Sequence, residues 1–397
     1  MEGNRHEADR AIVYFGPRTG FDELVGSRVR EGDRTVGYLD AIRSYNAKIR
    51  ASDLASHEPR ISVPDYVDNC VVHADDFGSV LSHVIANFAT ILEETYEVGT
   101  LFVQNPPRRA LESLVSAQGE DSVEQISYRY EQVEKGALEA IYDNVCEEVL
   151  GQEESKRVLV ASLYRLSVMD NGRPSVVLLY GPSGVGKTET ARCLSKALGG
   201  KLMRIQFSMM QTQEAYEYLF GAEHSKASLA RDLLGRESNV VLIDEFDKVS
   251  PTLYNMFYQL FDEGRYIDTN YDVDMRGSLF LLTTNFKSER DARRAMGSAM
   301  FSRISACVAF SDLSDENKAT IATRHYQRVV DRLDDEDRSV IEGSDMLSWF
   351  VARASHYDNM RTMKNGIEKA IFERLSEPIF NRQATTPIAR RDPLQGV

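Results

Sequence analysis

The chain has 397 residues, 42% of them hydrophobic, and its 61 acidic side chains outnumber 47 Lys and Arg to give a net charge of −14. This length exceeds one ordinary domain, so we expect two or three domains. The acidic balance disfavours a nucleic-acid surface, and no apolar stretch approaches the roughly 20 residues of a membrane span, so a cytoplasmic protein without a membrane span is expected.

Residues 1–135 carry no recognisable motif. We expect them to form a partner-binding domain with an α+β or mostly helical fold of unknown type. Seven apolar residues recur at helical spacing behind Asp75-Asp76 and predict one amphipathic helix. They are Phe77, Val80, Leu81, Val84, Phe88, Ile91 and Leu92. A second helical stretch is predicted from about Val123 to Val149.

Residues 136–310 alternate between apolar runs and helical segments. Strands are predicted over 176–180, 202–207, 240–244 and 279–282, and a helix from Ser250-Pro251 to Gly264. This order predicts an α/β fold: a parallel P-loop sheet with helices on both faces and its ligand at the carboxyl ends of the strands.

The pattern becomes purely helical after this sheet. Residues 311–380 are predicted to form a small helical subdomain. Residues 381–397 carry Gln, Thr, Pro and Arg and are expected to form a flexible tail.

Residues 181–188 read Gly-Pro-Ser-Gly-Val-Gly-Lys-Thr, which is a complete phosphate-binding loop. Its glycines allow backbone N–H groups to point at phosphate oxygens, and the helix that follows adds its positive end. Lys187 is expected to bridge the β and γ phosphates, and Thr188 to ligate Mg²⁺. The predicted nucleotide-binding residues are Gly181, Pro182, Ser183, Gly184, Val185, Gly186, Lys187 and Thr188.

An acidic pair follows the apolar run 240–243. Asp244 is placed to hold Mg²⁺ together with Thr188, and Glu245 to act as general base for the attacking water. Asn285, at the end of another predicted strand, can hydrogen-bond that water or the γ phosphate. These residue types in this order predict an enzyme that binds ATP with Mg²⁺ and hydrolyses it.

Five segments in register resemble the ATPase module of the Clp-type AAA+ unfoldases across roughly residues 140 to 380. They are Gly151-Gln152-Glu153-Glu154, the P-loop, Ile243-Asp244-Glu245-Phe246-Asp247-Lys248, Leu260-Phe261-Asp262-Glu263-Gly264-Arg265 and Thr283-Thr284-Asn285. The resemblance implies that Val149 and Leu150 line the adenine pocket. It also makes Arg303 the arginine finger, which reaches a neighbouring subunit's γ phosphate, and Arg361 the sensor-2 arginine. A finger in trans implies a homo-oligomeric ring or spiral, which in this family has six subunits.

The chain departs from the Clp pattern between the second strand and the acidic strand. Residues 220–229 are shorter than the family's Gly-aromatic-Val-Gly pore loop and carry no aromatic residue at the tip. In the family, the aromatic residues of this loop grip a polypeptide in the central pore. Torsin-type relatives also lack them. Tyr216, Tyr218 and Phe220 could substitute, although core packing is favoured for them, and Tyr266 and Tyr271 either pack in the core or face a pore. A single ATPase module is expected, with no tripeptide that would dock a Clp protease.

Two functions fit these observations. The leading one is an oligomeric, chaperone-like ATPase that remodels a protein partner held by residues 1–135. The alternative is an ATP-dependent oligomeric scaffold or sensor that activates an effector protein without threading a polypeptide. A DNA-loading ATPase is disfavoured by the net acidity of the chain.

Overall fold

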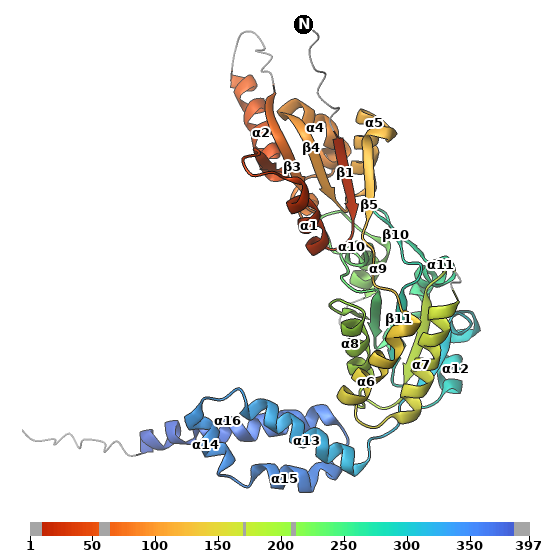
Figure 1. Cartoon of the computed structure of the whole chain (residues 1–397), viewed down its shortest axis with the longest axis vertical. Coiled ribbons are helices and arrows are strands. Elements are labelled where there is room, and N and C mark those ends of the chain that lie inside the picture. Colours follow the sequence, from red (N-terminus) through yellow and green to blue (C-terminus); the bar gives the residue numbers. More distant parts are fainter. Residues whose placement is uncertain (1–9, 55–63, 170–171, 208–211, 385–397) are drawn as a thin grey trace, which may run out of the picture.

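The computed structural model describes residues 10–54, 64–169, 172–207 and 212–384. Two five-stranded sheets and a helical unit follow one another along the long axis of the molecule (Figure 1). None of the described helices is both long and apolar enough to cross a membrane.

The first sheet has the order β2-β3-β4-β1-β5, and every neighbouring pair of strands is parallel. Its strands are β1 (Arg10–Phe15), β2 (Thr35–Gly37), β3 (Asp65–Val72), β4 (Tyr96–Gln104) and β5 (Val123–Ser127). The helices around it are α1 (Arg18–Arg28), α2 (Tyr38–Leu54), α3 (Ser82–Ala86), α4 (Phe88–Thr95) and α5 (Arg108–Gln118). Its largest apolar cluster includes Tyr38, Phe77 and Phe88, whose rings touch one another.

This parallel α/β sheet corrects the α+β or mostly helical fold expected for residues 1–135. The strands escaped recognition because β3 and β4 bury only their later residues and begin with exposed or half-exposed ones such as Asp65 and Glu97. A strand in the middle of a parallel sheet ordinarily reads as a nearly continuous apolar run.

The single helix predicted over 77–92 is also wrong, because the segment forms a 3₁₀ turn (Asp76–Ser79) followed by α3 and α4. Val80 and Leu81 are extended, and Asn87 interrupts the second half. Likewise, the stretch predicted to be helical from 123 to 149 begins as β5 and becomes helical in α6 (Leu138–Glu148).

The second sheet has the order β12-β6-β11-β8-β7 and is again parallel throughout. Its strands are β6 (Ser175–Tyr180), β7 (Met203–Gln206), β8 (Val240–Asp244), β11 (Leu279–Thr284) and β12 (Ala306–Ala309). Its helices are α6, α7 (Glu153–Val168), α8 (Lys187–Ala197), α9 (Thr212–Phe220), α10 (Leu229–Leu234), α11 (Asn255–Glu263) and α12 (Glu289–Phe301), and a hairpin joins β9 (Arg265–Ile267) to β10 (Asp272–Asp274).

Alternate residues of β6 belong to different apolar clusters, with Val176 and Leu178 in one and Val177 and Leu179 in the other. Each face of the sheet is therefore covered, and the predicted P-loop sheet with helices on both faces is confirmed.

A helical unit follows β12. It contains α13 (Asp315–Val330), α14 (Asp335–Glu342), α15 (Met346–Arg353) and α16 (Met360–Ala384), packed around its own apolar core. Helix α16 extends a few residues into the predicted tail, and residues 385–397 of that tail lie outside the described residues.

Candidate nucleotide site

The loop between β6 and α8 has the backbone of an anion-binding turn. Gly181, Gly184 and Gly186 have φ values of 132°, 82° and 109°, a region that side chains disfavour. A Cβ on Gly181 would overlap the carbonyl oxygen of Phe310, and one on Gly184 would lie 2.8 Å from Asn359 Oδ1. Glycine is required at both positions because neighbouring chain approaches the loop so closely.

Lys187 begins α8 and is only 7% exposed. Its Nζ donates to the carbonyl oxygens of Gly181 and Pro182, both at 2.6 Å, and lies 3.4 Å from Asn285 Oδ1. Burial lowers the pKa of this ammonium group to about 8, although the nearby Asp244 carboxylate opposes the shift. A buried cation is therefore held in the centre of the loop, beside the predicted Asn285.

The acidic pair ends β8 at the same edge of the sheet. Asp244 is 6% exposed and accepts from Arg204 Nε at 2.9 Å and Nη2 at 2.6 Å, while Thr283 Oγ1 donates to its other oxygen. Glu245 has left-handed backbone angles (φ 55°, ψ 44°), and its N–H donates to Thr283 Oγ1 at 3.0 Å. Gln206 Nε2 lies 3.3 Å from Glu245 Oε2.

Sequence reasoning missed Arg204 and Gln206, and it named Thr283 only as part of the Thr283-Thr284-Asn285 segment, without a contact to the acidic pair. The available signal for Arg204 and Gln206 was that they are polar residues near the carboxyl end of a predicted strand. The local sequence pattern does not say which strands lie beside β8. The contacts of these residues with the acidic pair therefore follow only from the order of the strands in the sheet.

The oxygen donors beside the loop suit Mg²⁺. The Asp244 carboxylate and the half-buried Thr188, one residue into α8, provide one carboxylate and one hydroxyl. Mg²⁺ typically takes one or two carboxylates and completes its shell with water and substrate phosphates. No cluster of three or more His, Cys, Asp or Glu that could hold a metal by itself occurs in the described part of the chain.

A cavity of about 120 Å³ adjoins the P-loop where the sheet domain meets the helical unit. Val149 and Leu150, both predicted to contact adenine, line it, and a Cβ on Gly186 would lie 3.1 Å from Val149 Cγ1. The other lining residues are Glu148, Gly184, Val185, Gly186, Glu189, Leu313, Ile321, Arg324, His325, Arg328, Met360 and Lys364. Those from α13 and α16 were missed, since their spacing indicates only a helix.

Comparison with known proteins agrees with this geometry. Residues 173–336 match the family described as AAA domain (Cdc48 subfamily). The ATP-binding subunit ClpC of the ATP-dependent Clp protease from Staphylococcus aureus strain USA300 is 22% identical over 424 residues, covering 91% of this chain and 51% of that protein. Residues 173–336 form a Clp-type AAA+ module.

Two further similarities extend the comparison. Chaperone protein ClpB 2 of Nostoc sp. strain PCC 7120 is 26% identical over 283 residues, covering 62% of this chain and 32% of that protein. A solved structure of Hsp104 in a closed state with ATPγS and FITC casein matches with a TM-score of 0.52 and 15% identity, covering 95% of this chain and 90% of that one. The chain thus spans about half the length, or less, of these curated relatives.

Arg303 is separated from the P-loop of its own AAA+ module. Ser305 N–H donates to Val176 O at 2.7 Å, which places this segment at the amino end of β6, whereas the P-loop follows its carboxyl end. The four-residue rise from Val176 to Tyr180 separates the two ends by roughly 13 Å. The Arg303 guanidinium contacts Asp262 Oδ2, with Nη2 at 2.6 Å, and lies 4.2 Å from the Tyr258 ring centre.

Arg361 lies in the first turn of α16, next to the P-loop. Its N–H donates to Asn359 Oδ1 at 2.8 Å, and this same oxygen is the atom that a Cβ on Gly184 would meet. The Arg361 side chain is exposed. The helical unit therefore contacts the P-loop through the residues that precede the predicted sensor-2 arginine.

The aromatic residues that could face a pore differ in their exposure to solvent. Tyr266 and Tyr271 are 1% and 4% exposed, and Tyr266 Oη donates to Leu219 O at 2.6 Å, so both belong to the core. Tyr216 is 51% exposed and stacks on Phe220, with ring centres 4.2 Å apart. The expectation that Tyr216 packs in the core is therefore wrong.

Proposed function

We propose that the chain is an oligomeric ATPase that binds ATP with Mg²⁺ between neighbouring subunits and uses hydrolysis to remodel a protein partner. The observation that carries the proposal is the separation of charges on the second sheet. Lys187, the acidic pair and Asn285 gather at one end, while Arg303 stands near the other. A subunit can complete its neighbour's site but not its own.

In this proposal the P-loop N–H groups and Lys187 hold the triphosphate. Thr188 and Asp244 are the protein ligands of Mg²⁺, which when bound neutralises charge on the phosphate oxygens. Val149 and Leu150 contact the adenine ring, and Arg361 reaches towards the phosphates from α16. The boundaries we assign are 136–310 for the large subdomain and 311–380 for the small one.

Glu245 is the general base of the proposed reaction. Its carboxylate takes a proton from water as the water oxygen bonds to the γ phosphorus, and the bond from phosphorus to the bridging oxygen breaks to release ADP and phosphate. Gln206 steadies the carboxylate, and Asn285 orients the water or the γ phosphate. Arg303 from the neighbouring subunit stabilises the charge that builds up on the transferring group.

Arg204 should restrain this site, because it occupies the Asp244 oxygen that Mg²⁺ needs. Its side chain is 43% exposed, and such an ion pair is worth at most about 1 kcal/mol. We expect Arg204→Ala to lower the Mg²⁺ concentration for half-maximal ATP turnover about threefold to fivefold, as measured by phosphate release across a Mg²⁺ titration. Arg192→Ala, which removes an exposed arginine paired with Glu189, is the control. An unchanged or raised Mg²⁺ requirement would refute the competition.

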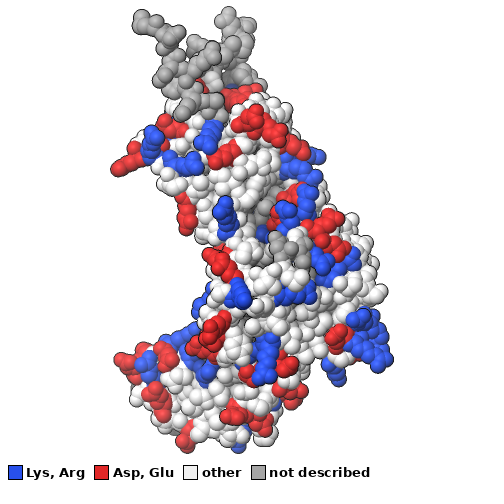
Figure 2. All heavy atoms as spheres, turned by 45° about the vertical axis from the view of Figure 1, so that its right-hand side comes forward, with Lys and Arg blue, Asp and Glu red and all other residues white. Residues whose placement is uncertain are grey.

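The nature of the partner rests on the comparisons and on surface charge. The Hsp104 structure that resembles this chain contains casein, a protein, and ATPγS. Figure 2 shows basic and acidic side chains interspersed over the visible face, with no basic stripe of the kind that binds nucleic acid. We therefore propose a protein partner of the N-terminal region, a six-membered ring or spiral, and a cytoplasmic location.

One observation favours the scaffold alternative. In the interval that replaces the family's pore loop, His224 is 9% exposed and its Nε2 lies 2.7 Å from Val80 O of the first sheet domain. A segment held in this way is poorly placed to move with a threaded polypeptide. In this second candidate, ATP-driven assembly displays or activates an effector, and hydrolysis resets it.

The proposal is tested by measuring oligomer mass and ATP turnover together over a range of protein concentrations with saturating ATP and Mg²⁺. We expect turnover per subunit to rise in step with assembly. Full turnover by a monomer would overturn the shared site. Affinity capture with the Glu245→Gln protein should retain the partner; biological function that survives in Glu245→Gln but not in Lys187→Ala would select the scaffold alternative.

A further inference from the structure

The two sheets of this chain have one topology. Numbered along the chain, without the β9-β10 hairpin, the strands of each sheet lie in the order second, third, fourth, first, fifth, and all are parallel. The register of the two central strands also agrees. Gln104 lies opposite Tyr14 in the first sheet as Thr284 lies opposite Tyr180 in the second.

Residues at the carboxyl ends of the strands correspond as well. An asparagine follows the fourth strand in both sheets, Asn105 in the first and Asn285 in the second. The motif Asp75-Asp76-Phe77 begins three residues after the end of β3 and is similar to Asp244-Glu245-Phe246, which begins with the last residue of β8. Each motif leads into a 3₁₀ turn with a fully buried phenylalanine. The first sheet therefore retains the outline of a triphosphate site.

The phosphate loop itself is absent from the first sheet. Six residues separate β6 from α8, but only Gly16 and Pro17 separate β1 from α1. Pro17 has no N–H to offer, and Arg18 stands where α8 has Lys187. The loop that would wrap a phosphate cannot form from two residues.

Protein groups take the place of the phosphate. Asn105 Oδ1 accepts from Gly16 N–H at 2.9 Å, and Asn105 Nδ2 donates to Gly16 O at 2.8 Å. Gln104 Nε2 donates to the same carbonyl at 3.1 Å, and a Cβ on Gly16 would overlap Tyr128 Cβ. The asparagine that would contact a γ phosphate is instead bonded to the backbone beside it.

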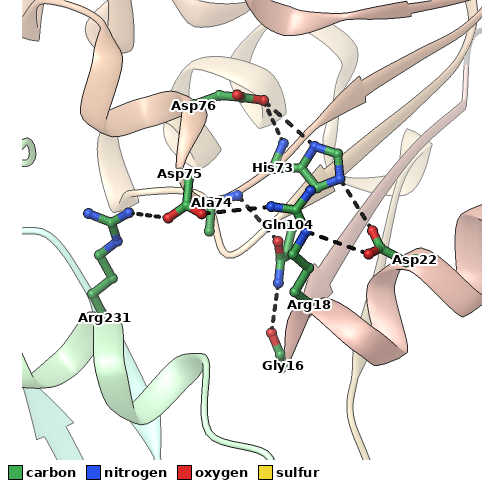
Figure 3. Close-up of polar contacts among 9 residues, drawn as sticks. All are labelled: Gly16, Arg18, Asp22, His73, Ala74, Asp75, Asp76, Gln104 and Arg231. Atoms are coloured by element: carbon green, nitrogen blue, oxygen red, sulfur yellow. Dashed lines mark hydrogen bonds and ion pairs between the residues drawn. The ribbon is translucent and has the colours of Figure 1, made fainter. Parts of the chain in front are cut away.

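The charged groups of this edge are paired with protein, as Figure 3 shows. His73 lies between Asp22, at 3.3 Å from its Nε2, and Asp76, which accepts from His73 N–H at 2.8 Å. Asp75 accepts from Arg231 Nη2 at 2.6 Å, and its other oxygen lies 3.8 Å from Arg18 Nη1.

Arg231 belongs to the AAA+ module, and it is one of several links from that module to this edge. Besides the His224 contact with Val80, the Arg108 N–H donates to Asn270 O at 2.8 Å, and Arg108 Nη2 donates to Asp268 O at 3.0 Å. Helix α10, which carries Arg231, buries Leu229 and Leu233 in the cluster that contains alternate residues of β8.

We propose that residues 10–127 are a second P-loop-type domain that has lost its nucleotide site, and that its former phosphate edge is a docking surface for the AAA+ module's segment 224–236 and turn 268–271. The chain binds one nucleotide, not two. Because α10 shares an apolar cluster with Val241 and Ile243 of β8, the strand that ends in Asp244, the docked edge is connected through this cluster to the catalytic strand. This last step rests on the proposed function.

The loss of the site is tested by calorimetric titration of the full chain with ATPγS and Mg²⁺. We expect one nucleotide per chain, and none in Lys187→Ala. Two nucleotides per chain, or one that persists in Lys187→Ala, would overturn the loss. Absence of any binding by the wild type would contradict the proposed function alone.

Docking is tested by hydrogen exchange on the full chain without nucleotide. Asp75→Arg puts like charges opposite Arg231 and is expected to speed exchange in 224–236 about fivefold, and Arg231→Asp in that background should reverse the change. Asp65→Arg is the matched control, because Asp65 begins β3, whereas Asp75 lies three residues beyond the other end of β3, and the two side chains are 74% and 75% exposed. Equal exchange in the two single variants would overturn the docking surface.

Discussion

Replacing Arg303 with alanine is expected to lower ATP turnover about 10³-fold to 10⁵-fold while leaving ATP binding nearly unchanged, because an arginine finger acts on charge that develops only in the transition state. The structure motivates this result by its placement of Arg303 at the amino end of β6, held by Asp262 and stacked on Tyr258. The measurement is phosphate release alongside equilibrium binding of ATPγS.

Mixing experiments separate a finger from a structural arginine. Arg303→Ala keeps an intact P-loop, whereas Lys187→Ala keeps an intact finger, so mixed oligomers contain interfaces with both. We expect turnover to reappear when the two inactive proteins are mixed. Arg294→Ala, which removes an exposed arginine of α12 paired with Asp291, should keep wild-type turnover. If Arg303→Ala turns over ATP like Arg294→Ala, the shared site is wrong.

The second sheet could be predicted from the sequence because its strands obey simple rules. Residues 176–179 and 240–243 are apolar without interruption, and both faces of those strands are buried. The P-loop glycines mark the turn that follows, because three left-handed positions in six residues leave few alternatives. Strand type, order along the chain and the position of the loop all follow from local pattern.

The first sheet could not be predicted in the same way. Its P-loop had been lost, so the strongest local signal was missing, and polar residues occupy the exposed beginnings of β3 and β4. The pattern around Asp75-Asp76 predicts the start of one long helix, but the pair lies just after β3 and leads into a 3₁₀ turn, in a sheet with the same strand order as the second. Topology is a non-local property, so the correspondence emerges only when both sheets are compared in three dimensions.

The residues of the functional site also fall into two groups, those that local motifs predict and those that depend on the three-dimensional packing. Lys187 and Asn285 are separated by 98 residues, yet parallel strands with a common edge bring them together, as the motif order predicts. The contact of Arg204 with Asp244 could be predicted only if the strand beside β8 were known. The residues that line the cavity beside the P-loop could be predicted only from the packing of α13 and α16. The role of Arg303 depends on an assembled oligomer and that of Arg361 on a bound nucleotide, so both stay predictions.

Glu245→Gln is expected to reduce turnover about 10²-fold to 10⁴-fold, because an amide cannot accept the proton that the attacking water loses. Binding should survive, since Lys187, Thr188 and Asp244 are untouched and glutamine preserves the volume of the side chain. Its amide can also still pair with Gln206, which lies 3.3 Å from the carboxylate.

The variant should therefore remain in an ATP-bound assembly, which single-turnover phosphate release and mass measurement can follow together. Glu263→Gln, an exposed change on α11 at a residue that accepts from Gln259, is the matched control and should behave as wild type. If Glu245→Gln retained wild-type turnover, a residue other than Glu245 would be the general base. The remaining candidate beside the site is Asp247, whose buried Oδ1 has no hydrogen-bond partner among the described residues, so Asp247→Asn would then be the variant that abolishes hydrolysis.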